Sequence, residues 1–161
     1  MQKVYTIGYA GITPQKFLEV LKENEVTLLI DVRSMPKSRY FANFNDNVLL
    51  KELPKHNIKY ENWQEFGARQ LNFNYDTIAN SEPFKKAINR VKASTDTICL
   101  MCAEIDPINC HRAILAGRYL DNLTNIIAKR NGEIIYETKA ETEKRFNGDY
   151  ERQGEKISYK Q

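Results

Sequence analysis

Residues 97–112 read Thr-Ile-Cys-Leu-Met-Cys-Ala-Glu-Ile-Asp-Pro-Ile-Asn-Cys-His-Arg. The first five are apolar or β-branched and show no alternation, which predicts a strand buried on both faces of a parallel sheet. The usual ligand crevice of an α/β fold lies beyond the carboxyl ends of such strands, so Cys102 to Arg112 are expected there. A helix predicted to begin at Asn109 or Cys110 adds its positive dipole end, which favours a nearby anion or thiolate.

The flanking segments predict a single three-layer α/β domain with a mainly parallel sheet and helices on both faces. Strands are expected at 4–7, 26–32, 97–101, 125–128 and 134–136, and helices at 14–21, 47–56, 83–91 and after Cys110. The first strand, helix and second strand form a βαβ unit, which requires parallel pairing. This domain is assigned to residues 1–136. Residues 137–161 carry many charges and few aliphatic side chains, so they are expected to form a solvated helix and a fraying tail attached to it.

Composition limits the class of protein. The 161 residues, 42% of them hydrophobic, suffice for the core of one domain. A formal net charge of +3 is too small to indicate nucleic-acid binding by itself. No apolar stretch approaches the roughly 20 residues of a membrane span and no signal-peptide pattern is present, so we expect a cytoplasmic protein with no membrane partner. The three cysteines are expected to be reduced thiols, and the oligomeric state is left open.

Two further segments with potential chemistry follow predicted strands. Gly8 and Gly11 come after the first strand, where they allow either a close backbone approach to a ligand or only a tight turn. Asp31 ends the second strand, and three cations follow it within the segment 31–39. An ion pair between Asp31 and Arg33 could fix this loop. We favour an anion site, because forked guanidinium donors match phosphate or carboxylate.

An aromatic cluster is expected between residues 59 and 75. Its members are Tyr60, Trp63, Phe66, Phe73 and Tyr75. Such a cluster forms a small core under a loop, or else a lid or stacking platform for a base.

Three blocks together resemble the domain-of-unknown-function family 488. They are Tyr-Thr-Ile-Gly-Tyr at 5–9, Asp-Val-Arg-x-x-Pro-x-Ser-Arg at 31–39 and Met-Cys-Ala-Glu-x-Asp-Pro-x-x-Cys-His-Arg at 101–112. The resemblance implies a compact single α/β domain from a bacterium or archaeon, and it carries no reaction with it. Its blocks point to Gly8, Asp31, Arg33, Pro36, Ser38, Arg39, Cys102, Glu104, Cys110, His111 and Arg112. The histidine that members often carry in the strand before Gly132 is absent, because residues 125–128 read Asn-Ile-Ile-Ala.

These residues predict an anion-binding crevice, and the sharpest hypothesis is an enzyme acting on a phosphorylated or nucleotide-like ligand, although whether the protein is an enzyme is left open. Cys110, Glu104 and Asp31 are the catalytic candidates, and Gly8, Arg33, Ser38, Arg39, Cys102, His111 and Arg112 are the ligand-binding candidates. Nearby cations and a helix start lower the pKa of a thiol, so Cys110 or Cys102 is the expected nucleophile. Glu104 is favoured as acid or base over His111, because successive helical residues point about 100° apart. The alternative without chemistry is that both thiols only pack in the apolar core.

Two alternatives from other classes stay open. Cys102, Glu104, Cys110 and His111 offer enough ligands for zinc, although the paired Cys-x-x-Cys spacing is missing and neither a metal nor another cofactor is predicted. Cations and aromatics also interleave in the segment 37–44, which would suit a nucleic-acid or nucleotide binding module without catalysis. The near-neutral charge of the chain argues against this module.

Overall fold

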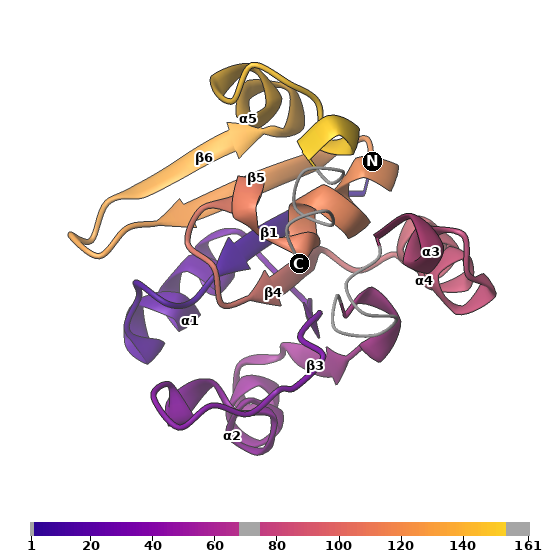
Figure 1. The fold of residues 1–161 in the computed structure, drawn as a ribbon. Coiled ribbons are helices and arrows are strands. Elements are labelled where there is room, and N and C mark those ends of the chain that lie inside the picture. Colours follow the sequence, from indigo (N-terminus) through magenta and orange to yellow (C-terminus); the bar gives the residue numbers. More distant parts are fainter. Residues whose placement is uncertain (1, 68–74, 154–161) are drawn as a thin grey trace.

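The computed structural model describes residues 2–67 and 75–153, which form one six-stranded sheet in the order β3-β2-β4-β1-β5-β6 (Figure 1). The strands are β1 (Val4–Gly8), β2 (Leu28–Asp31), β3 (Lys59–Asn62), β4 (Ile98–Cys102), β5 (Leu123–Ala128) and β6 (Ile134–Thr138). All neighbours pair in parallel except β6, which runs antiparallel to β5 at one edge. The predicted mainly parallel sheet is therefore confirmed.

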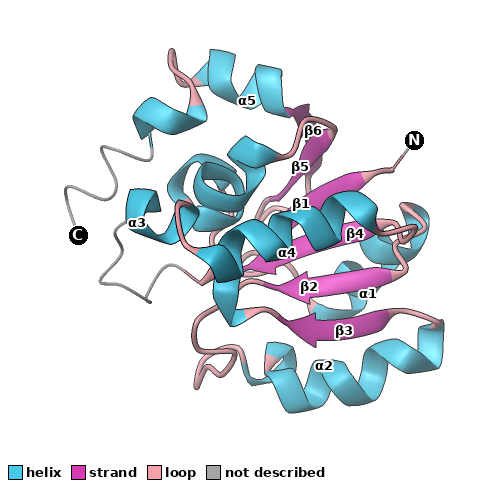
Figure 2. Ribbon diagram, turned by 90° about the vertical axis from the view of Figure 1, so that its right-hand side faces the viewer, coloured by secondary structure: helices cyan, strands magenta, loops and turns pink. Residues whose placement is uncertain are grey.

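Helices cover both faces of the sheet, as the sequence predicted (Figures 1 and 2). The longer ones are α1 (Pro14–Glu23), α2 (Asp46–Glu52), α3 (Tyr75–Ala79), α4 (Glu82–Ala93) and α5 (Lys139–Arg145). Apolar residues of α1 and α2 join one buried core, and those of α3 and α4 join a second core on the other face. Single turns of 3₁₀-helix occur at Ala42–Phe44, Leu53–His56, Gln64–Phe66, Pro107–Asn109 and Gly117–Tyr119, and a π-helix occurs at Arg112–Ala116.

The two longest helices begin at side-chain caps that the sequence supplies. The Thr13 side chain accepts a hydrogen bond from the Lys16 amide at the start of α1. The Ser81 side chain accepts one from the Phe84 amide at the start of α4. In both helices proline stands in the first turn, where its missing N–H costs nothing.

The sequence missed strand β3 and the short helix α3, and the helix after Cys110 is less regular than expected. β3 lies at the edge of the sheet and reads Lys-Tyr-Glu-Asn, with only Tyr60 buried, so it has no apolar run to reveal it. The expected helix after Cys110 is present but irregular. The Cys110 carbonyl accepts from the Ile114 amide, and the turns that follow are a π-helix, Arg112–Ala116, and a 3₁₀-helix, Gly117–Tyr119.

The end of the chain is more firmly packed than its composition suggests. Thr142 in α5 and Tyr150 beyond it are both fully buried. Asn125 in β5 donates hydrogen bonds to both side chains and so ties this end to the sheet. The expectation of a solvated end is therefore wrong for these two residues, whereas the predicted tail at 154–161 lies outside the described residues. None of the helices in the described part of the chain combines the length and the apolar character needed to cross a bilayer.

Candidate functional site

The segments predicted to carry chemistry meet at the carboxyl edge of the sheet. Gly8 of β1 pairs with Cys102 of β4, and Asp31 of β2 pairs with Met101. The ladder continues past the strand ends, since the Tyr9 amide donates to the Cys102 carbonyl. Neighbouring parallel strands thus bring their following loops together, which is the geometry that a shared site requires.

Two thiols and an imidazole gather at this edge. The Sγ atoms of Cys102 and Cys110 and a ring nitrogen of His111 all lie within 4.8 Å of one another. Nδ1 of His111 is 4.0 Å from the Cys102 sulfur and 3.9 Å from the Cys110 sulfur. Cys102 is 7% exposed and Cys110 only 2%, whereas His111 is half-buried, so the cluster lies just beneath the surface.

The orientation of the His111 ring is fixed by a backbone contact to the ring nitrogen that does not face the sulfurs. Its Nε2 lies 2.7 Å from the carbonyl oxygen of Val32, which follows β2. Because a carbonyl only accepts hydrogen bonds, Nε2 must carry a proton in this contact. Nδ1 is then the nitrogen that faces the sulfurs and can exchange a proton with them.

The angular argument that favoured Glu104 over His111 assumed an α-helix at Cys110, and Cys110 is not helical. Its backbone is extended, at φ −132° and ψ 139°, between the 3₁₀ turn and the π-helix. Consecutive side chains there need not diverge as they do on an α-helix. π-Helical turns recur at functional sites, where they redirect side chains.

The two thiols have opposite tendencies to ionise. Burial alone would raise the pKa of Cys110, but the neighbouring Cys102 thiol and the charges of His111 and Arg112 hold that pKa well below its usual range. The neighbouring Cys110 and burial keep the pKa of Cys102 well above its usual range. Burial would lower the pKa of His111, but the neighbouring Cys110 thiolate raises it. The directions of these pKa shifts favour a Cys110 thiolate beside a His111 imidazolium.

Arg112 is a fully buried cation whose charge contributes to lowering the pKa of Cys110. Its guanidinium donates to the carbonyls of Glu104, at 2.6 Å, and Ile105, at 3.2 Å, and to the Thr6 hydroxyl, at 3.2 Å. No ion pair recorded among residues 2–67 and 75–153 joins it to a carboxylate. A buried charge is costly without a counter-charge, and a Cys110 thiolate provides one.

Arg33 forms an ion pair with Asp31. Their ion pair is buried, with Nε to Oδ1 at 2.9 Å and an η nitrogen to Oδ2 at 2.7 Å. Tyr60 also donates to this carboxylate, and Arg33 further donates to the Tyr9 hydroxyl and the Phe44 carbonyl. The alternative of an ion pair that fixes the loop is therefore present. Anion binding by Arg33 and catalysis by Asp31 stay predictions.

The remaining catalytic candidate, Glu104, does not sit in a desolvated crevice. It is exposed, and the group that it directs inward is its backbone carbonyl, which accepts from Arg112. A Cβ atom on Gly8 would lie 1.5 Å from that carbonyl oxygen, so glycine is required where the two loops touch.

The loop after β2 holds the last predicted ligand-binding residues. The Ser38 hydroxyl accepts from the amides of Tyr40 and Phe41 and so shapes a turn. Arg39 is exposed. Arg112 and Arg33 therefore use their donors inside the protein, whereas Arg39 faces solvent.

The expected aromatic cluster is divided between the two main cores, with Trp63, Phe66 and Tyr75 in one and Tyr60 in the other. Tyr60, Trp63, Phe66 and Tyr75 are buried, and Phe73 lies outside the described residues. The lid or stacking platform is thus not supported for these four. Tyr75, which the sequence placed only in the aromatic cluster, is also a neighbour of the thiol site: burial raises its pKa, and so do the charges of Cys110 and Cys102.

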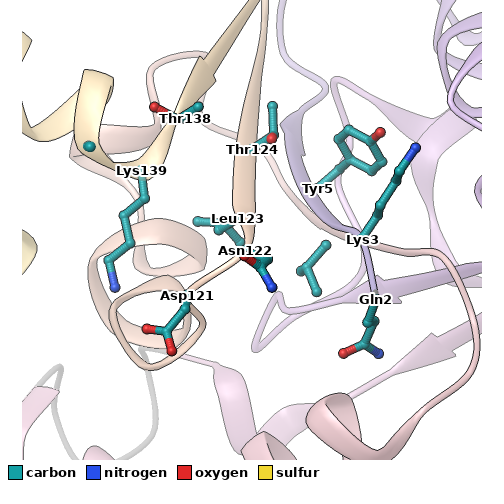
Figure 3. A pocket seen from close by; sticks show the side chains of 11 residues that line it. Gln2, Lys3, Tyr5, Asp121, Asn122, Leu123, Thr124, Thr138 and Lys139 are labelled. Atoms are coloured by element: carbon teal, nitrogen blue, oxygen red, sulfur yellow. The ribbon is translucent and has the colours of Figure 1, made fainter.

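A separate hollow of about 430 Å³ lies at the opposite edge, where β1 and β5 begin (Figure 3). Lys3, Tyr5, Asp121 and Lys139 are among the residues that line it. It shares no residue with the thiol cluster, so it contributes nothing to the site predicted from the sequence.

The comparisons with known proteins agree with the resemblance of the three blocks. The family model described as Domain of unknown function DUF488 matches residues 13–119, which is more than half of the chain. The chain belongs to the DUF488 family. No curated protein and no solved structure gives a match. The DUF488 match covers the loop after β2 and the whole cluster of Cys102, Cys110 and His111, although the first block, at 5–9, lies outside it.

Proposed function

We propose that this DUF488 protein is a thiol-dependent enzyme in which Cys110 is the nucleophile and His111 its proton acceptor. The observation that carries the proposal is the position of the His111 ring. Nε2 is held by the Val32 carbonyl, and Nδ1 is within 4.0 Å of both sulfurs. A nucleophile next to a base that a third group orients is the arrangement typical of covalent catalysis.

The electrostatics of the pocket support the same residue. Transfer of the Cys110 proton to Nδ1 creates a thiolate and an imidazolium side by side. Arg112, buried and without a carboxylate among the described ion pairs, adds a second positive charge that stabilises the thiolate. The Cys102 thiol, whose sulfur lies within 4.8 Å, also lowers the pKa of Cys110. Three groups thus favour the reactive form of one thiol.

The substrate that we propose is small and anionic, as the sequence suggested. Arg33 and Arg112 are engaged inside the protein, so the contact with the substrate is assigned to Arg39, which is exposed on the loop after β2. Phosphorylated and nucleotide-like ligands belong to this class. The nucleic-acid alternative would rely on the same Arg39 and on Tyr40, which is 90% exposed.

The test is a time course of alkylation of the native protein with iodoacetamide between pH 5 and 9, followed by peptide mass spectrometry. The pH at which the alkylation rate of Cys110 is half-maximal should lie below about 8.5, the ordinary pKa of a thiol. Cys99 is the matched control, because it is fully buried and burial raises its pKa. Reaction of Cys110 no faster than that of Cys99, or only after unfolding, would show that Cys110 is a packing residue.

A zinc site is the competing use of the same atoms. Zinc sites closed by protein take four ligands, and the described residues bring three donors together here. Metal analysis of protein purified without added zinc distinguishes the two uses. One equivalent of zinc whose removal exposes Cys102 and Cys110 to alkylation would overturn the proposal, and metal-free protein with a reactive Cys110 supports it.

A further inference from the structure

A second thiol next to a nucleophilic thiol changes the chemistry that the site can perform. Cys102 and Cys110 have their sulfurs within 4.8 Å of each other, and both sulfurs lie beside the same ring nitrogen of His111. Both side chains belong to the core on the same face of the sheet, whereas Cys99 belongs to the core on the opposite face. Of the three cysteines, only these two are placed to form a disulfide with each other.

We infer that Cys102 is a resolving thiol, and that the pair exchanges with a low-molecular-weight disulfide while His111 moves the protons. The inference rests on the proposed function of Cys110 as nucleophile and names the chemical class of its substrate. It does not follow from a reactive Cys110 alone, because a nucleophilic thiol needs no thiol partner.

In the first step the Cys110 thiolate attacks one sulfur of the substrate, written RS–SR′. The bond between Cys110 and RS forms, the S–S bond of the substrate breaks, and R′S⁻ leaves. The imidazolium of His111 gives its proton to R′S⁻, so R′SH departs and Nδ1 becomes free to accept a proton.

In the second step the Cys102 thiol loses its proton to Nδ1 of His111, which is 4.0 Å from that sulfur. The Cys102 thiolate attacks the Cys110 sulfur, the bond to RS breaks, and RS⁻ takes the proton from the imidazolium. The protein is oxidised by two electrons to a Cys102–Cys110 disulfide, and the substrate is reduced by two electrons to two thiols. The substrate disulfide accepts both electrons, so the reaction requires no other oxidant.

The position of His111 supports both steps. Its Nδ1 is nearly equidistant from the two sulfurs, at 3.9 and 4.0 Å, so one nitrogen can serve each thiol in turn. The low and high pKa values of Cys110 and Cys102 give the order: the ionised thiol attacks first, and the protonated one resolves.

Glutathione disulfide is the probe, added to native protein that carries Cys99→Ala to remove the third thiol. Intact-mass spectrometry should show a product that lacks two hydrogen atoms and carries no glutathione. Adding Cys102→Ser should instead accumulate an adduct of one glutathione on Cys110. Adding Cys110→Ser should abolish both products. Cys102→Ala repeats the trapping experiment should the serine variant unfold.

The outcomes separate the inference from the proposed function. A glutathione adduct that persists on Cys110 even when Cys102 is present, while iodoacetamide still modifies Cys110 rapidly, overturns the resolving role and leaves the nucleophile. Resistance of Cys110 to both reagents in the folded protein overturns both. Formation of the internal disulfide with trapping in both Cys102 variants supports both.

Discussion

The guanidinium of Arg33 is bound by the carboxylate of Asp31, two residues before it in the chain, through a pair of hydrogen bonds of 2.9 and 2.7 Å. The ion pair is buried at the end of β2, next to the Val32 carbonyl that orients His111. The first role of this ion pair is therefore to hold the loop whose Val32 carbonyl orients the His111 ring. The same sequence pattern would have suited an exposed anion site.

Replacing Asp31 with Asn should destabilise the protein strongly. Arg33 would keep its charge in a buried position without a carboxylate, and Tyr60 would lose a charged acceptor. Removing one partner of a buried pair typically costs about 3–5 kcal/mol. The free energy of unfolding from urea titration is the measurement. Asp46→Asn, which removes the acid of the exposed pair with Lys37, is the control and should cost less than about 1 kcal/mol.

Gly8→Ala should disturb the loop contact behind Arg112. The new Cβ would lie 1.5 Å from the Glu104 carbonyl oxygen, which belongs to the backbone and cannot simply swing away. Overpacking of this kind costs about 3 kcal/mol or more, equivalent to a fall in Tm of roughly 10 °C. Gly148→Ala is the control, since a Cβ there meets nothing closer than 3.8 Å. Equal Tm values for the two variants would contradict the tight contact.

Tyr150→Phe should show that the end of the chain is attached to the sheet. The tyrosine hydroxyl accepts a hydrogen bond from Asn125, and its loss leaves a buried amide without that acceptor. We expect a loss of about 1–3 kcal/mol in the free energy of unfolding. Tyr136→Phe removes a hydroxyl that bonds Asn24 on the surface, so its effect should be negligible. A Tyr150→Phe protein as stable as Tyr136→Phe would mean that the buried bond contributes nothing.

His111→Asn should shift the pH dependence of Cys110 alkylation upward. In the native protein the Cys110 pKa is lowered, so the thiolate is present above that pKa and is lost as the pH falls through it. Without the imidazolium the pKa rises, and each unit of rise lowers the thiolate fraction tenfold at a pH below it. We expect the rate at pH 7 to fall by about tenfold or more and to recover at alkaline pH. An unchanged profile would remove His111 from the reaction.

The sequence predicted those parts of the fold that burial dictates, and missed those that depend on local geometry. β4 was recognisable because a strand covered on both faces must be apolar throughout. β3 was not, because an edge strand with a solvated side keeps polar residues. His111 was ranked below Glu104 as acid or base because a regular helix was assumed at Cys110. Whether Arg33 binds Asp31 or a ligand is a question of side-chain packing, which residue types alone do not decide.

The proposed preference for an anionic substrate can be tested with a variant of Arg39 before the substrate is identified. Iodoacetate and iodoacetamide attack thiols by the same chemistry but differ by one negative charge. The proposed contact between Arg39 and the substrate predicts that this arginine raises the relative rate of the anionic reagent, because opposite charges attract over about 10 Å at moderate ionic strength. Arg39→Ala should therefore lower the ratio of the iodoacetate rate to the iodoacetamide rate at Cys110 by about two- to fivefold.

Lys37→Ala is the matched control for this measurement, since Lys37 lies on the same loop but is paired with Asp46. It should change the ratio much less than Arg39→Ala does. High salt should bring the native protein toward the ratio of Arg39→Ala, because it screens the attraction. If both variants keep the native ratio, Arg39 does not guide anions to Cys110. The preference for an anionic substrate would then have no support from any of the three arginines, because the other two already use their donors inside the protein.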